Sequence, residues 1–262
     1  MKQFFVTATD TDAGKTFVSC ALIYALQQQI IKAKNKPMIV AAFKPISAGC
    51  ELVNDQLINE DAKLLSQFAN AKQSIAMINP ITFKDPIAPH IAAKKENVSL
   101  SISEIELHYN VVKALNADVI IVEGAGGWRL PLGVSPKINS LVKCVGDNKQ
   151  SYQFLSDFAK RSQHDVILII NMKLGCLNHA LLTFEAIKTD GLNCIAWVAN
   201  CASSESMNNL AENITELEQL LPIPKIAQFD FFNDVDKEGN HISFKEKIKF
   251  AASQINLAPL LT

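Results

Sequence analysis

The sequence predicts a doubly wound α/β fold, in which a mostly parallel sheet is covered by helices on both faces. Six short, β-rich apolar runs recur along the 262-residue chain, and longer stretches with helical periodicity lie between them. The apolar runs are unbroken rather than alternating, as expected of strands that are buried on both faces. They are FFVT (4–7), MIVAAF (38–43), VIIVE (119–123), VILIIN (166–171), CIAWVAN (194–200) and KIAQF (225–229).

The composition restricts the partners of this chain. Hydrophobic residues make up 48% and charged residues 19%, and the formal net charge is -1. We therefore expect a small charged metabolite as ligand, with no nucleic acid and no membrane as partner. The longest aliphatic run, 166–170, falls far short of the about 20 residues that span a bilayer. The six cysteines form no C-x-x-C pair and are expected to be reduced thiols of a soluble, cytoplasmic protein.

The first apolar run leads into ATDTDAGKT (8–16), which ends like a phosphate-binding loop. Its Gly14-Lys15-Thr16 precedes a stretch with helical character, where backbone N–H groups and the positive end of the helix dipole face phosphates. We expect Lys15 to meet the β- and γ-phosphate oxygens and the Thr16 hydroxyl to ligate Mg²⁺. The alternative is an ordinary helix N-terminus that carries a lysine by chance.

Ala8 stands where such loops usually begin with glycine, and five residues instead of four separate it from Gly14. Alanine costs little at this position if its φ is negative, and much if the loop needs a positive φ. The backbone conformation at Ala8 therefore decides whether the loop keeps its shape.

Charged residues follow two further strands. Lys44 comes directly after MIVAAF, which places a second cation at the same sheet edge as Lys15 and suggests a site for phosphate and another anion together. Glu123 ends VIIVE and is followed by GAGG, so it is either a metal ligand or part of a simple turn. Asp61 is either a metal ligand or a first-turn acid that favours the helix dipole.

The segments between the strands complete a single domain over residues 1–262. In ISEIELHYNVVKALN, Ile102, Ile105, Val112 and Leu115 share a helix face, and Ser101 with Glu104 makes a capping box. Residues 133–151 have little periodicity and are expected to form a surface loop, with an insertion near 134–150.

In its motifs the chain resembles the dethiobiotin synthase family. The matching segments are TDTDAGKT (9–16), FKPISAG (43–49), NPITFKDPIAPHIAA (79–93), VEGAGGWRLPL (122–132), KLGCLNHALLT (173–183) and WVAN (197–200). They stand in the family's order and span most of residues 4–200, which is far more specific than the phosphate loop alone. The resemblance implies a P-loop NTPase-like fold.

The resemblance also implies a reaction. 7,8-Diaminononanoate takes up CO₂ as a carbamate, ATP phosphorylates it, and the second amine closes a ring with loss of phosphate. Lys15 would hold the transferred phosphoryl group, Lys44 would stabilise the carbamate and its mixed anhydride, and Thr11 would lie near both. Members of the family are homodimers that share the substrate site, so residues 175–180 would complete the partner's site.

The resemblance assigns three sets of residues. The nucleotide-binding set is Asp12, Ala13, Gly14, Lys15, Thr16, Phe17, Asp61, Glu123, Gly124, Ala125, Gly126, Asn200 and Cys201, in which Asn200 matches the residue that reads adenine. The substrate-binding set is Lys44, Ser47, Ala48, Gly126, Gly127 and Asn178. Thr16, Asp61 and Glu123 would hold Mg²⁺.

Four features depart from the family pattern. Ala8 replaces the first loop glycine, and Ala48 replaces a hydroxyl residue, so that the substrate contact there falls to Ser47 or to the backbone. The run IAQFDFF (226–232) departs from a Gly-Glu-Ile-Pro-like run near adenine, and the loop around 134–150 is the fourth departure.

Three alternatives remain at this point. A partition-type ATPase would normally carry a further lysine at the start of the loop, where this chain has Ala8, Thr9 and Asp10. An amidotransferase-like synthase would usually carry an additional glutaminase domain. A degenerate nucleotide-binding module on the same fold would have no need of Lys44.

Overall fold

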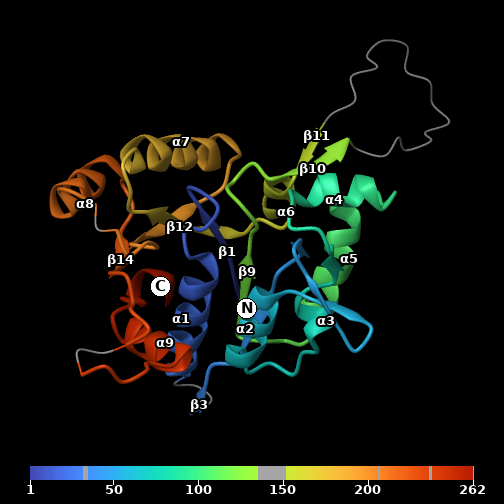
Figure 1. The fold of residues 1–262 in the computed structure, drawn as a ribbon, viewed down its shortest axis with the longest axis horizontal. Helices are drawn as coiled ribbons and strands as arrows, with labels where there is room; N and C mark the ends of the chain where they lie inside the picture. The colour runs from blue at the N-terminus through green and yellow to red at the C-terminus, as the bar shows by residue number, and fades with distance from the viewer. Residues whose placement is uncertain (32–34, 135–151, 206, 236–237, 262) are drawn as a thin grey trace, which may run out of the picture.

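A six-stranded parallel sheet forms the centre of the molecule (Figure 1). The computed structural model describes residues 1–31, 35–134, 152–205, 207–235 and 238–261. In spatial order the strands are β14 (Lys225–Phe229), β13 (Cys194–Asn200), β12 (Asp165–Asn171), β1 (Lys2–Ala8), β9 (Val119–Glu123) and β4 (Val40–Phe43). All six predicted strands are therefore confirmed.

The order of the strands reverses at β1. The chain first fills the positions on one side of β1, with β4 and β9, and then crosses to the other side for β12, β13 and β14. In open parallel sheets, ligands bind beyond the carboxyl ends of the strands at such a switch point. The loop after β1 lies at this point.

Successive side chains of each strand point to opposite faces of the sheet, and because nearly all of them are apolar, a hydrophobic core forms on each face. Phe4, Val6 and Ala8 pack on one face, against α1 (Lys15–Gln27), α2 (Glu60–Phe68), α9 (Phe244–Ser253) and α10 (Ala258–Leu261). Phe5 points to the other face, which α5 (Ile102–Lys113), α6 (Leu155–Arg161), α7 (Cys176–Thr189) and α8 (Leu210–Leu220) cover. Because helices cover both faces, the strands are apolar without interruption. None of the described helices combines the length and apolarity needed to cross a membrane.

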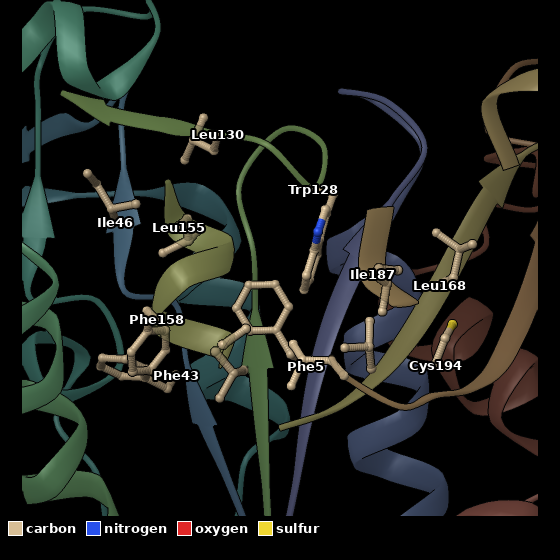
Figure 2. Close-up of a cluster of buried hydrophobic side chains, with 14 of the residues drawn as sticks. Phe5, Phe43, Ile46, Trp128, Leu130, Leu155, Phe158, Leu168, Ile187 and Cys194 are labelled. Carbon is tan, nitrogen blue, oxygen red and sulfur yellow. The ribbon is translucent and has the colours of Figure 1, made fainter. Parts of the chain in front are cut away.

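Figure 2 shows part of the second core, in which side chains from distant segments meet. The rings of Phe5 and Trp128 pack edge to face, with centroids 5.8 Å apart. Phe43 and Phe158 pack in the same way at 6.3 Å. Trp128 follows β9, so this packing fixes the segment that leaves the carboxyl end of the strand.

Helix α5 begins at the predicted N-cap, Ser101, and one of the two hydrogen bonds of the predicted capping box is formed. The hydroxyl of Ser101, its N-cap, accepts a hydrogen bond from the backbone N–H of Glu104 at 3.2 Å. Ile102, Ile105 and Val112 are buried on one face, and Leu115 packs against the same core. This burial confirms the predicted apolar face.

Strand β4 starts two residues later than predicted. The backbone N–H of Met38 donates to the carbonyl of Gln29, outside the sheet, at 3.1 Å. The chain before it is bent into a small antiparallel pair, β2 (Ile30–Ile31) and β3 (Lys36–Pro37). The apolar run is thus longer than the strand that it contains.

Three further two-stranded pairs and two short helices complete the described fold. The pairs are β5 (Ile46–Ser47) with β8 (Ile81–Thr82), β6 (Glu51–Val53) with β7 (Gln56–Ile58), and β10 (Pro131–Val134) with β11 (Tyr152–Phe154); the helices are α3 (Ile75–Ile78) and α4 (Pro89–Lys95). Strands β10 and β11 flank the predicted insertion, which lies outside the described residues except for Val134.

Candidate active site

The phosphate-binding loop connects β1 directly to α1. Ala8 is the last residue of β1, pairs with Ile169 of β12 and is fully buried. Its strand backbone has the ordinary negative φ, so that this position does not require glycine. The left-handed positions of the loop are instead Asp12, with φ 55°, and Gly14, with φ 78°.

Gly14 is required for a second reason, because Asn200 packs directly against it. A Cβ atom at Gly14 would lie 2.2 Å from the Asn200 side-chain nitrogen. That nitrogen donates to the carbonyl of Ala13 at 2.8 Å, and Asn200 is buried at the end of β13. The predicted adenine-reading residue therefore holds the phosphate loop in this structure.

Lys15 is the first cation of the site. It begins α1, is 9% exposed, and donates from Nζ to the carbonyl of Asp10 at 3.0 Å. Burial lowers its pKa, although Glu123 opposes that shift. The Lys15 ammonium thus contacts the backbone of its own loop. Bound phosphates would replace the Asp10 carbonyl as its partner.

Lys44 is the second cation, and it lies between two carboxylates. Its Nζ is 2.6 Å from Oε1 of Glu123 and 2.9 Å from Oδ2 of Asp61. Burial opposes the charge of Lys44, but the two carboxylates outweigh it and raise the pKa of Lys44. Burial likewise opposes the charge of Asp61, and the Lys44 ammonium outweighs it and lowers the pKa of that carboxyl. Both groups are therefore charged over the neutral range.

Thr16 completes this cluster and makes it suitable for a metal ion. Its hydroxyl donates to Oε1 of Glu123 at 3.0 Å. Oε2 of Glu123 is buried and finds no hydrogen-bond partner among the described residues, and the Glu123 side chain is 1% exposed. A hydroxyl and two carboxylates are the hard oxygen donors that Mg²⁺ prefers. The residues present thus fit the metal that the sequence analysis expects.

Asn79 supports Lys44 and was not singled out in the sequence. Its side-chain nitrogen donates to the Lys44 carbonyl at 2.7 Å, and its Oδ1 accepts from the Ser47 hydroxyl at 2.6 Å. The backbone N–H of Lys44 donates to the carbonyl of Ile78 at 2.7 Å. The segment before β8 therefore fixes the backbone that carries Lys44. The only sign in the sequence was that Asn79 opens the segment 79–93.

A cavity of about 860 Å³ joins these groups. Of the predicted site residues, its lining includes Thr11, Asp12, Gly14, Lys15, Thr16, Phe17, Lys44, Ser47, Ala48, Asp61, Ala125, Gly126, Asn200 and Cys201. Ala13, Glu123, Gly124, Gly127 and Asn178 are not among the lining residues. Ala13 and Glu123 are buried beneath the lining, whereas Asn178 is exposed on α7.

One end of this cavity is aromatic. The sequence analysis named Phe17 and the run 226–232 there, but not Phe244 or Lys247. Phe17 lies 5.1 Å from Phe232 and 6.1 Å from Phe244, measured between ring centroids. Lys247 of α9 donates to the Phe232 carbonyl at 3.2 Å and pairs with Asp234 at 2.6 Å. The end of the run 226–232 thus forms an aromatic side of the cavity, and contacts from Lys247 of α9 hold it in place.

The glycine stretch after Glu123 packs against β1 and the phosphate loop. Gly124 donates to the carbonyl of Val6 at 3.0 Å, and a Cβ at Gly126 would lie 3.8 Å from the Thr11 hydroxyl oxygen. Trp128 then donates to Asp190, the C-cap residue of α7, at 2.9 Å. Helix α7 therefore helps to hold the loop that faces Thr11.

A third lysine reaches the phosphate loop from the segment after β12. The Lys173 ammonium pairs with the carboxylate of Asp10, whose own Oδ1 accepts from the Thr11 backbone N–H at 2.9 Å. Lys173 chiefly causes the lowered pKa of Asp10. The sequence analysis quoted this segment but gave Lys173 no part in the loop.

Comparison with known proteins shows the family of this chain. A family model described as an AAA domain matches residues 2–238. The ATP-dependent dethiobiotin synthetase BioD of Alteromonas mediterranea is 42% identical over 240 residues, which cover 90% of this chain and 95% of the relative. The chain belongs to the dethiobiotin synthetase family. The synthetase of Pseudoalteromonas translucida is 40% identical over 87% of this chain and 89% of its own.

The fold of this family member also resembles that of more distant proteins. A ParA family ATPase from Chlorobium tepidum superimposes with a TM-score of 0.51 over 98% of this chain and 93% of its own, at 14% identity. At that identity the similarity shows the fold alone. It confirms the predicted P-loop NTPase-like architecture.

Proposed function

We propose that this protein closes the ureido ring of dethiobiotin from 7,8-diaminononanoate, CO₂ and ATP. As a member of the dethiobiotin synthetase family it is an ATP-dependent ligase of biotin synthesis. The observation that carries the finer proposal is the placement of two cations, Lys15 and Lys44, on one cavity. A module that only binds nucleotide has no use for the second cation.

The first step forms a carbamate. One amine of the substrate attacks CO₂: a C–N bond forms, one C=O π bond opens to leave the negative charge on oxygen, and the amine proton passes to water. The carbamate anion lies against the Lys44 ammonium, which Asn79 and Ile78 hold through its backbone. Ser47 and Ala48 line the same cavity as Lys44, which supports their role as substrate contacts near this anion.

The second step transfers the γ-phosphoryl group of ATP to a carbamate oxygen: a new P–O bond forms, the P–O bond to the β-phosphate breaks, and ADP leaves. Lys15 and the loop residues Asp12, Ala13 and Gly14 hold the phosphates, and Thr11 lies beside the transferred group. When bound, Mg²⁺ on Thr16, Asp61 and Glu123 supplies charge neutralisation for the phosphate oxygens. Phe17, Ala125, Asn200 and Cys201 line the nucleotide end of the same cavity. Transition-state charge is thus stabilised by fixed cations, without a covalent enzyme intermediate.

The third step closes the ring. The second amine attacks the carbonyl carbon of the mixed anhydride, a C–N bond forms, the C–O bond to phosphate breaks, and phosphate leaves with the proton lost by the amine. Gly126 has no side chain to fill the space beside Thr11, which leaves room for the substrate there. Positioning of the two amines supplies most of the rate in such a step.

We also propose that residues 1–262 act as one domain and as a cytoplasmic homodimer. Both core clusters share the central sheet, which supports the single domain. Asn178 is exposed on α7 and does not line the cavity of its own chain, which supports a role in the partner's substrate site.

The test is an assay with 7,8-diaminononanoate, bicarbonate, Mg²⁺ and each nucleoside triphosphate in turn. Phosphate release and ring product should rise together, and the nucleotide series fixes the base preference. Phosphate release without substrate, or intact nucleotide binding without product, would contradict the proposal and favour a switch or a binding module.

The Lys44→Gln variant tests the second cation. We expect turnover to fall by about two to three orders of magnitude, as when one group that stabilises a developing charge is removed. ATP binding should change little, because Lys15 holds the phosphates. Lys63→Gln is the control, since Lys63 pairs with Glu60 on the surface of α2 at 3.3 Å. Unchanged turnover in Lys44→Gln would remove Lys44 from the mechanism.

A further inference from the structure

Lys44 occupies the position that the metal ligands surround. Its ammonium contacts both carboxylates of the proposed metal site, Glu123 at 2.6 Å and Asp61 at 2.9 Å. The Lys44 side chain is 5% exposed and that of Glu123 is 1% exposed. The pair is therefore a buried contact with little solvent to screen it.

A metal on these residues would need the same oxygen atom that Lys44 uses. The Thr16 hydroxyl lies 3.0 Å from Oε1 of Glu123, and Lys44 donates to that same oxygen. A cation that contacts Thr16 and Glu123 together therefore approaches Oε1, because Oε1 is the Glu123 oxygen that the Thr16 hydroxyl contacts. Mg²⁺ binds its oxygen ligands at about 2.0–2.1 Å, which leaves no room for the ammonium at the same place.

We infer that the Lys44 ammonium and the divalent ion exclude each other at Asp61 and Glu123. In the metal-free protein Lys44 neutralises the two carboxylates. Binding of the metal releases the ammonium from them and makes it available to the anionic substrate. This inference rests on the metal position in the proposed function, and it gives Lys44 a role before any substrate arrives.

The structure allows this exchange without a change in the backbone. The Lys44 N–H and carbonyl are held by Ile78 and Asn79, each at 2.7 Å, so that only the side chain needs to move. Lys44 also lines the cavity, which gives its ammonium space to turn into. Lys44 would thus be ready for a carbamate only once the metal for phosphoryl transfer is bound.

The direct test is a titration with Mn²⁺ alone, followed by electron paramagnetic resonance. Lys44→Met removes the competing charge at similar length, and we expect Mn²⁺ to bind at least about ten-fold more tightly, the lower end of what one adjacent charge does to proton binding by a carboxylate. Lys247→Met is the matched control, because Lys247 lines the same cavity but pairs with Asp234. Its Mn²⁺ affinity should equal that of the wild type. Equal or weaker binding in Lys44→Met would overturn the inference.

A second measurement uses the unaltered protein, in case Lys44→Met does not fold. Lysines are acylated with and without Mn²⁺, and the modified positions are mapped by mass spectrometry. Lys44 should become more reactive with the metal while Lys247 does not change, and an unchanged Lys44 would overturn the inference. Neither readout needs turnover, so a failure of the proposed reaction and a failure of this exchange are separate results.

Discussion

Ala8 shows how one residue can depart from a familiar motif without changing its geometry. Its side chain is fully buried among strand and helix residues, and its backbone belongs to β1. The loop takes its left-handed turns later, at Asp12 and Gly14. The first glycine of the usual motif is therefore not needed here.

Reversion of Ala8 to glycine should consequently bring no gain. We expect Ala8→Gly to leave nucleotide affinity unchanged and to lower the free energy of unfolding by about 1 kcal/mol, since a buried methyl group is lost and the unfolded chain gains freedom. Calorimetric nucleotide titration and urea unfolding measure the two effects. Tighter nucleotide binding by the variant would show that alanine distorts the loop.

His164 is a buried titratable residue that lies apart from the active site. It is 1% exposed, and its Nε2 lies 2.9 Å from the hydroxyl of Tyr109, which in turn donates to Gln3 at 2.6 Å. Burial lowers the pKa of His164 from 6.5 to about 4. The ring is therefore neutral in the folded protein at neutral pH.

This pKa predicts a pH dependence of stability. Between pH 6.5 and about 4 the unfolded chain binds a proton on His164 that the folded chain does not, so the free energy of unfolding falls as the pH drops through this window. The loss should reach up to about 3 kcal/mol. Urea unfolding of wild type and His164→Gln across this range should show a shallower pH slope in the variant. Parallel slopes would contradict the prediction.

At the scale of elements, the hydrophobicity pattern of the sequence predicted the strands that are long and buried. The six central strands are buried on both faces, and that burial requires the continuous apolar runs from which they were predicted. Strands β5 and β8 contain two residues each, too few to show a period, and their pairing joins segments far apart in the chain. The residue Asn79 lies beside this pairing, so its contact with Lys44 could not be predicted.

The contacts of Asn79, in the connection between β4 and β8, lead to a prediction about stability and turnover. Asn79→Ala leaves the Lys44 carbonyl and the Ser47 hydroxyl without their partner, which should cost about 2 kcal/mol of stability and also reduce turnover. Asn70→Ala is the matched control, because Asn70 bonds to Val40 and Met38 at the other end of the same strand. It should lower stability but not turnover. Thermal unfolding and steady-state rates distinguish the two, and equal losses of turnover would contradict a specific support of Lys44.

At the scale of the whole molecule, the candidate active site lies where several strands of one sheet end. Lys15, Lys44, Glu123 and Asn200 each follow or end a strand of one sheet, and their convergence could be predicted from the sequence for that reason. Lys173, Lys247 and Phe244 reach the same region from loops and helices. No local pattern marks such residues, because their positions depend on how distant segments pack.

The proposed substrate site, shared between two subunits, makes a prediction about mixed dimers. Lys44→Gln and Asn178→Ala each disable a site, but a heterodimer of the two would keep one site with both native residues. With random exchange, half of the dimers are mixed, so about a quarter of the wild-type activity should return. Activity is measured after the two inactive proteins are mixed and allowed to exchange subunits. A mixture that stays inactive would place Asn178 and Lys44 in the same subunit's site, or in none.

The two tryptophans of the chain give this protein a built-in optical probe. Trp197 is fully buried within β13, whereas Trp128 follows the glycine stretch and is bonded to Asp190. Trp197→Phe would leave a single indole close in sequence to Gly126, which lines the cavity of the candidate active site. Its emission could then follow ligand arrival in real time, without a label and without turnover.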